Sequence, residues 1–100
     1  MRFKTAKLFR MEQYEITITG RVQGVGYRYY TVQQAQLLGV KGYVRNQADN
    51  SVLVVAQADE EIIDIFIDYL HIGPTRARVD HISKIKINYF SVFNNFSVKY

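Results

Sequence analysis

The segment Arg21–Arg28, RVQGVGYR, combines two glycines with an arginine at each end and contains no acidic residue. Gly24 and Gly26 let the backbone turn sharply and point several N–H groups toward one place. Arg28 adds a full positive charge and a planar fork of donors that matches a phosphate or a carboxylate. This combination is typical of a loop that binds a small anion.

Other kinds of catalytic chemistry find little support in the sequence. The chain has no cysteine, which excludes disulfides and thiol catalysis. The two histidines, His71 and His81, are ten residues apart and match no common zinc spacing, so we predict no metal site. Ser51, Thr31 and the scattered acidic residues have no base partner in any pattern, so we assign them no catalytic role.

The elements on either side of the loop give it a defined setting. Residues 14–19 alternate between apolar and polar, which predicts a half-buried strand that ends at Gly20. Apolar residues at helical spacing predict a helix over residues 27–38, and Gly39 is placed to end it in a left-handed conformation. The loop therefore precedes a helix N-terminus, whose partial positive charge favours anions.

The rest of the chain predicts four more strands and one more helix. Strands are expected over residues 42–47 and 52–57, joined by a turn in which Asp49 and Asn50 tolerate positive φ. Asp59 is the expected N-cap of a helix that reaches about His71. A fourth strand follows over residues 78–87, and a short one lies near residues 96–100.

This order of elements predicts the fold. The pattern β-α-β-β-α-β gives an α+β, two-layer ferredoxin-like sandwich, with an antiparallel sheet, two helices on one face and a short C-terminal strand. Such a fold hosts many activities, so function has to be argued from the loop and its surroundings.

The positive charge of the chain is concentrated at its start. Of the 13 basic residues behind the net charge of +4, four precede the first acidic residue, which leaves nine basic and nine acidic residues from position 11 onward. We predict a basic N-terminal extension over residues 1–13 and one domain over residues 14–100. The balanced domain argues against nucleic acid as a partner. No apolar run approaches the roughly 20 residues that cross a bilayer, and we predict a cytoplasmic protein without a membrane partner.

Two well-known phosphate-binding loops can be excluded. A Walker loop needs Gly-Lys followed by serine or threonine, which does not occur here. A dinucleotide-binding loop needs G-x-G-x-x-G, and Tyr29 stands where its third glycine belongs.

The whole string closely resembles a different family. GRVQGVGYR, residues 20–28, is similar to the acylphosphatase signature glycine-x-valine-glutamine-glycine-valine-x-phenylalanine-arginine, with Tyr27 in place of the phenylalanine. KGYVRN, residues 41–46, matches the second family signature, which centres on an asparagine. Gly73-Pro74 also fits the family, whereas Asp49-Asn50 departs from its usual Asp-Gly. The resemblance covers residues 14–100.

The resemblance implies an enzyme that hydrolyses acyl phosphates to a carboxylate and inorganic phosphate. It assigns Arg28 to binding of the phosphoryl group. It assigns Asn46 to orientation of the attacking water. Backbone N–H groups of the loop are expected to assist, namely those of Val22, Gln23, Gly24, Val25, Gly26 and Tyr27. A carboxylate is a good leaving group, and phosphoryl transfer mainly needs positioning and charge stabilisation. We therefore expect neither cofactor nor metal. We also expect a monomer.

Three alternatives stay open at this point. Four tyrosines could line the substrate site or simply pack in the core and at its rim: Tyr27, Tyr29, Tyr30 and Tyr43. The domain could bind phosphate or an acyl phosphate without turning it over. It could also bind RNA, as RRM domains of this fold do, although Val44 to Asn46 does not continue the RNP1 pattern begun by Lys41 to Tyr43.

Overall fold

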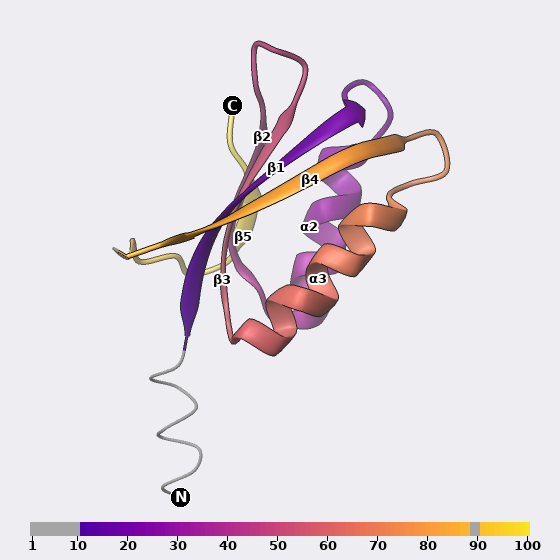
Figure 1. Cartoon of the computed structure of the whole chain (residues 1–100). Helices are drawn as coiled ribbons and strands as arrows, with labels where there is room; N and C mark the ends of the chain where they lie inside the picture. Colours follow the sequence, from indigo (N-terminus) through magenta and orange to yellow (C-terminus); the bar gives the residue numbers. More distant parts are fainter. Residues whose placement is uncertain (1–10, 89–90) are drawn as a thin grey trace, which may run out of the picture.

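The computed structural model describes residues 11–88 and 91–100 as a five-stranded sheet covered on one face by two helices (Figure 1). The strand order is β4-β1-β3-β2-β5. In chain order the elements are β1 (Glu12–Arg21), α2 (Tyr27–Leu38), β2 (Lys41–Asn46), β3 (Val52–Ala58), α3 (Glu60–Ile72), β4 (Arg78–Ile87) and β5 (Phe96–Val98). This arrangement confirms the predicted ferredoxin-like α+β fold.

The core lies between the sheet and the two helices. Ile16 and Ile18 of β1 are completely buried, as the alternating pattern predicts. On α3, Ile63 and Phe66 turn toward the sheet, and the Phe66 ring meets the ring of Phe96 edge-on at 5.9 Å. This contact ties the edge strand β5 to the helical layer.

The sheet differs from the prediction at its ends. β1 begins at Glu12, two residues before the predicted strand, and β5 ends at Val98. The four strands β4, β1, β3 and β2 pair antiparallel, but β5 pairs parallel to β2, so the complete sheet is mixed. The basic residues of the predicted extension, at positions 2, 4, 7 and 10, lie outside the described residues.

The reason for the parallel strand is the path of the chain after β4. β4 and β5 form opposite edges of the sheet, and residues 91–95 run over the sheet face away from the helices (Figure 1). There Gln57 Nε2 donates to the Ser91 carbonyl, and the Ser91 N–H donates to Gln13 Oε1. The ring of Phe93 packs edge-on against Tyr43 at 5.9 Å. The crossing places residues 96–100 beside β2 and next to the first turn of α2, which carries Arg28.

Gly39 takes the predicted left-handed conformation, and of the two turn residues expected to tolerate positive φ, Asn50 adopts it and Asp49 does not. Gly39 ends α2 with φ 74°, and Asn50 takes φ 73° in the turn between β2 and β3. In that turn Asp49 Oδ1 accepts hydrogen bonds from both the backbone N–H and the hydroxyl of Ser51. Within the described part of the chain, no helix combines the length and apolarity that crossing a bilayer requires.

Candidate active site

The glycine-rich loop between β1 and α2 is held from beneath by two valines. Val22 and Val25 are buried in the core, at 1% and 9% exposure, so the backbone between and beside them is kept at the surface. Gly24 and Gly26 have φ of 73° and 80°, a region that other residues enter only at a cost. Nothing lies within 4 Å of a Cβ built on either glycine, so conformation and not crowding requires glycine here.

The backbone N–H groups of this loop are left free of internal partners. Within residues 11–88 and 91–100, those of Val22 to Tyr27 donate no hydrogen bond to another backbone carbonyl. The first helical bond of α2 runs from the Tyr30 N–H to the Gly26 carbonyl, so the first turn contributes further unpaired donors. Free donors beside a helix N-terminus form a favourable environment for an anion.

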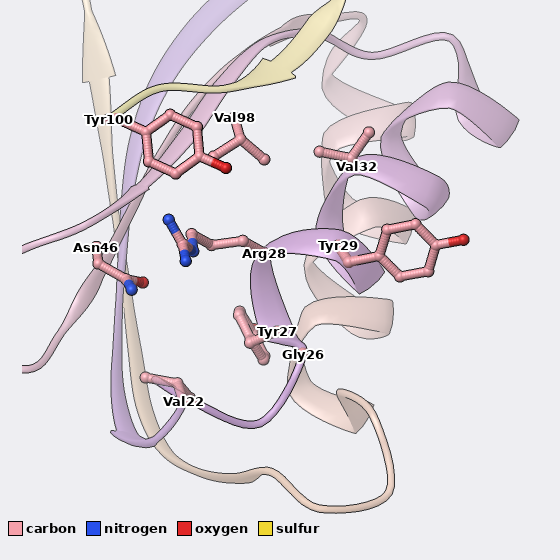
Figure 2. Close-up of a pocket in the computed structure, with 10 residues that line it drawn as sticks. Val22, Gly26, Tyr27, Arg28, Tyr29, Val32, Asn46, Val98 and Tyr100 are labelled. Atoms are coloured by element: carbon pink, nitrogen blue, oxygen red, sulfur yellow. The ribbon is translucent and has the colours of Figure 1, made fainter.

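Arg28 lies in the first turn of α2 and is half-buried. Its guanidinium carbon is 5.3 Å from the centre of the Tyr100 ring, a distance at which the ring face attracts a cation. No carboxylate of residues 11–88 and 91–100 forms an ion pair with it. Figure 2 shows its side chain reaching from α2 toward the region between Asn46 and Tyr100. A charge held in this way is available to an anionic ligand.

Asn46 is the last residue of β2, and its register places it opposite Val52 of β3. Its Oδ1 atom is buried and has no hydrogen-bond partner among the residues that the structure describes. Buried polar side-chain atoms are paired in the large majority of cases, so an unpaired one calls for a specific explanation. A water or substrate group bound in front of Asn46 would supply the missing donor.

These features meet in one cavity of about 370 Å³, which is within the usual range for small-molecule sites. Its lining residues come from the loop, α2, the end of β2 and the chain around β5: Val22, Gly24, Gly26, Tyr27, Arg28, Tyr29, Val32, Asn46, Val98 and Tyr100. Six of the eight site residues expected from the sequence are therefore brought together, Arg28 and Asn46 among them.

The other two expected residues, Gln23 and Val25, face elsewhere. The Val25 side chain belongs to the core. The Gln23 side chain points to the β2–β3 turn, where its Nε2 donates to the carbonyls of Gln47 and Ser51, each at 2.9 Å. Only their backbone N–H groups remain available for the expected role.

Three lining residues were missed from the sequence: Val32, Val98 and Tyr100. The alternation of Phe96, Val98 and Tyr100 was a usable signal, because Phe96 is buried against the helices and residues two apart share a face. Which strand β5 would join could not be read from that alternation, so its contribution to the cavity was not foreseen.

The four tyrosines have separate roles. Tyr27 is buried, and its hydroxyl donates to the Leu70 carbonyl at 2.8 Å, while the Tyr30 hydroxyl donates to the Tyr69 carbonyl at 2.7 Å. Tyr29 lines the cavity and is 69% exposed. Tyr43 lies on the opposite sheet face.

The environment of Tyr43 bears on the RNA-binding alternative. Its ring packs against Phe93, and Lys99 Nζ lies 4.5 Å from its centre. RRM domains stack bases on aromatic rings of the open sheet face. Here the aromatic ring on that face is engaged by neighbours within the chain, so nothing in this region favours the alternative.

Comparisons with known proteins agree with this geometry. A family model described as Acylphosphatase matches residues 14–98. The Acylphosphatase of Geobacter sulfurreducens is 45% identical over 85 residues, which covers 85% of this chain and 93% of the relative. The Acylphosphatase of Oceanobacillus iheyensis is 37% identical over 91 residues, which is 90% of this chain and 100% of the relative.

The solved structures point the same way. The crystal structure of acylphosphatase from Bacillus subtilis superposes with a TM-score of 0.86 at 31% identity, covering 89% of this chain and 99% of that one. The structure of an acylphosphatase from Coxiella burnetii gives 0.87 at 28% identity, covering 95% and 99%. With the family model spanning nearly all of the described domain, this chain belongs to the acylphosphatase family.

Proposed function

We propose that Arg28, Asn46 and the loop of residues 22–27 carry out the hydrolysis of the carboxyl–phosphate bond of acyl phosphates. The reaction belongs to the family, and its substrate is a small molecule that yields a carboxylate and inorganic phosphate. The observation that carries the residue assignment is the buried, unpaired Oδ1 of Asn46 in the same cavity as Arg28.

In this proposal the phosphoryl group binds against the loop. The N–H groups of residues 22–27 and the N-terminus of α2 donate to its oxygens, and the guanidinium of Arg28 donates as a planar fork. These donors are fixed before the substrate arrives, because the side chains of Val22 and Val25 anchor the loop to the core. Preorganised donors stabilise the charge that spreads over the oxygens in the transition state.

Asn46 then orients the nucleophile. Its Oδ1 accepts a hydrogen bond from a water, which leaves a lone pair of that water directed at phosphorus. The new P–O bond forms as the bond to the acyl oxygen breaks, and the carboxylate leaves with the electron pair. A phosphoryl oxygen of the substrate takes the proton from the water. No general acid is needed, because a carboxylate is stable without protonation at neutral pH.

The finer features of the proposal concern how the enzyme works in the cell. We propose a monomer, because Arg28, Asn46 and the loop that the proposed reaction uses all belong to one copy of the chain. We also propose a metal-free reaction, since the arginine and the backbone donors themselves balance the phosphate charge, and a location in the cytoplasm. Nucleic acid is not a proposed partner.

Steady-state hydrolysis of acetyl phosphate and benzoyl phosphate tests the function directly. Turnover with inorganic phosphate acting as a competitive inhibitor is the expected result. Phosphate binding without release of new phosphate would instead support a binding module that does not turn its ligand over. Addition of a chelator should leave the rate unchanged.

A further inference from the structure

The side chain of Gln23 connects the two halves of the site. Its Nε2 donates to the Gln47 carbonyl and to the Ser51 carbonyl, each at 2.9 Å. Gln47 directly follows Asn46, and its own N–H donates to the same Ser51 carbonyl at 2.9 Å. One amide group thus joins the phosphate-binding loop to the base of the β2–β3 turn, directly after Asn46.

The loop and Asn46 come from strands that are not neighbours in the sheet. The loop continues from β1, Asn46 ends β2, and β3 lies between these two strands. Gln23 is 24 residues from Gln47 in the sequence, yet its side chain spans the gap directly. The far side of the turn is stiffened separately, by Gln47 Nε2 donating to Ser51 Oγ and by Asp49 Oδ1 accepting from Ser51.

We propose that Gln23 is a positioning residue that sets the distance and angle between the bound phosphoryl group and the water held by Asn46. The inference rests on the proposed function and deepens it. In-line attack on phosphorus requires the water, the phosphorus and the leaving oxygen to be aligned, and a displacement of about 1 Å can cost on the order of 100-fold in rate. Two hydrogen bonds from one amide restrict both the distance and the rotation of the loop against the turn.

This role separates binding from turnover. Arg28 and the loop N–H groups lie on the loop side of the two Gln23 hydrogen bonds, so they still hold phosphate when these bonds are lost. Asn46 lies on the turn side. The effect of losing Gln23 should therefore fall on kcat, whereas a residue that only shaped the phosphate cradle would change phosphate affinity as well.

The first test compares Gln23→Met with Gln47→Ala. Methionine keeps most of the side-chain volume but donates no hydrogen bond, whereas Gln47→Ala removes a side-chain bond of the same turn and keeps the carbonyl that Gln23 uses. We expect kcat to fall about 10- to 100-fold in Gln23→Met, with KM and the inhibition constant of phosphate changed by less than about two-fold. Gln47→Ala should retain kcat within about three-fold. Equal losses in both variants would overturn the inference.

A double-mutant cycle tests the route through Asn46. If Gln23 acts by placing the water, Gln23→Met should lower kcat by less than about three-fold in an Asn46→Ala background. Additive losses, or a rise in the phosphate inhibition constant that matches the loss of kcat, would refute it. The wild-type rate in the same assay tests the proposed function separately.

Gln23→Glu provides a readout that does not depend on the folding of Gln23→Met. Its carboxylate faces two carbonyl oxygens and repels them, but its protonated form donates one hydrogen bond with the same side-chain length. The ratio of variant to wild-type kcat should therefore rise as the pH falls from 8 to 5, while the ratio for Gln47→Ala stays flat. A ratio for Gln23→Glu that is independent of pH would contradict the proposal.

Discussion

The hydroxyl of Tyr27 donates a 2.8 Å hydrogen bond to the carbonyl of Leu70, which joins the first turn of α2 to the last turn of α3. The same ring lies against Gly73, where an added Cβ would be 3.3 Å from its edge. Tyr27 stands where the family signature has phenylalanine, so the extra hydroxyl is used to satisfy a carbonyl at a helix end. The departure from the signature serves the packing of the two helices behind the loop.

The Tyr27→Phe variant should be less stable by about 1–2 kcal/mol, because it leaves a buried carbonyl without its partner. Urea unfolding of the two proteins, followed by far-UV circular dichroism, measures the difference. Tyr30→Phe, which removes a similar but more exposed bond to Tyr69, is the matched control and should lose less. A larger loss in Tyr30→Phe would contradict this view of the helix contact.

Alkaline pH should destabilise the wild-type protein more than Tyr27→Phe. Burial raises the pKa of the Tyr27 phenol well above its ordinary value of about 10.0, with a smaller contribution from Tyr30. Its stabilising contribution is therefore complete below pH 10 and is lost as the pH rises toward the folded-state pKa, because the unfolded chain releases the proton first. Unfolding free energies at pH 8 and pH 11 test this. Equal losses in both proteins would show that other groups cause the alkaline effect.

Arg28→Lys should lower kcat/KM at least about 100-fold despite keeping the charge, because the ammonium cannot present the planar fork to the phosphoryl oxygens. Arg28→Ala should lose at least as much. Circular dichroism should show the native fold in both variants, since Arg28 is outside the buried core. Near wild-type activity in Arg28→Lys would mean that charge alone is sufficient at this position.

Asn46→Ala should lower kcat about 100- to 1000-fold while the inhibition constant of phosphate changes less than about three-fold. The carboxamide is proposed to contact the water and not the phosphoryl group, so ground-state binding is spared. Parallel losses of turnover and phosphate affinity would assign Asn46 to the phosphate cradle.

Gly42→Ala should destabilise the protein by roughly 2–4 kcal/mol, from crowding and backbone strain together. Gly42 has φ 137°, and a Cβ there would overlap the Val55 carbonyl oxygen of the neighbouring strand. Gly39→Ala is the control, because Gly39 also has positive φ but has open space around it. It should cost only about 1 kcal/mol. Equal costs would show that conformation alone requires glycine at both sites.

Local patterns predicted most of the fold correctly. The helix over residues 27–38 and the strand over residues 78–87 match the structure residue for residue, because both have strong periodicity and clear ends. The signature string likewise predicted that Arg28 and the loop would meet Asn46, although the two segments are on different strands.

Features that depend on long-range placement could not be predicted. The crossing of residues 91–95 over the sheet is held by Gln13, Gln57 and Tyr43. The alternation of residues near position 96 does not predict this crossing. For the same reason Tyr100 was not expected above Arg28. The two hydrogen bonds made by the Gln23 side chain were missed because their acceptors are main-chain carbonyls, whose positions residue types do not indicate.

The position of β1 has a consequence for folding of the chain during its synthesis. Both of its neighbours in the sheet are made later, and Gln13 pairs with Ile87, 74 positions further along (87 − 13). Closing so long a segment is slow compared with forming a helix. A chain emerging from the ribosome therefore carries its phosphate-binding loop from early on, but gains a working site only when β4 and β5 have been added and the sheet has closed around β1.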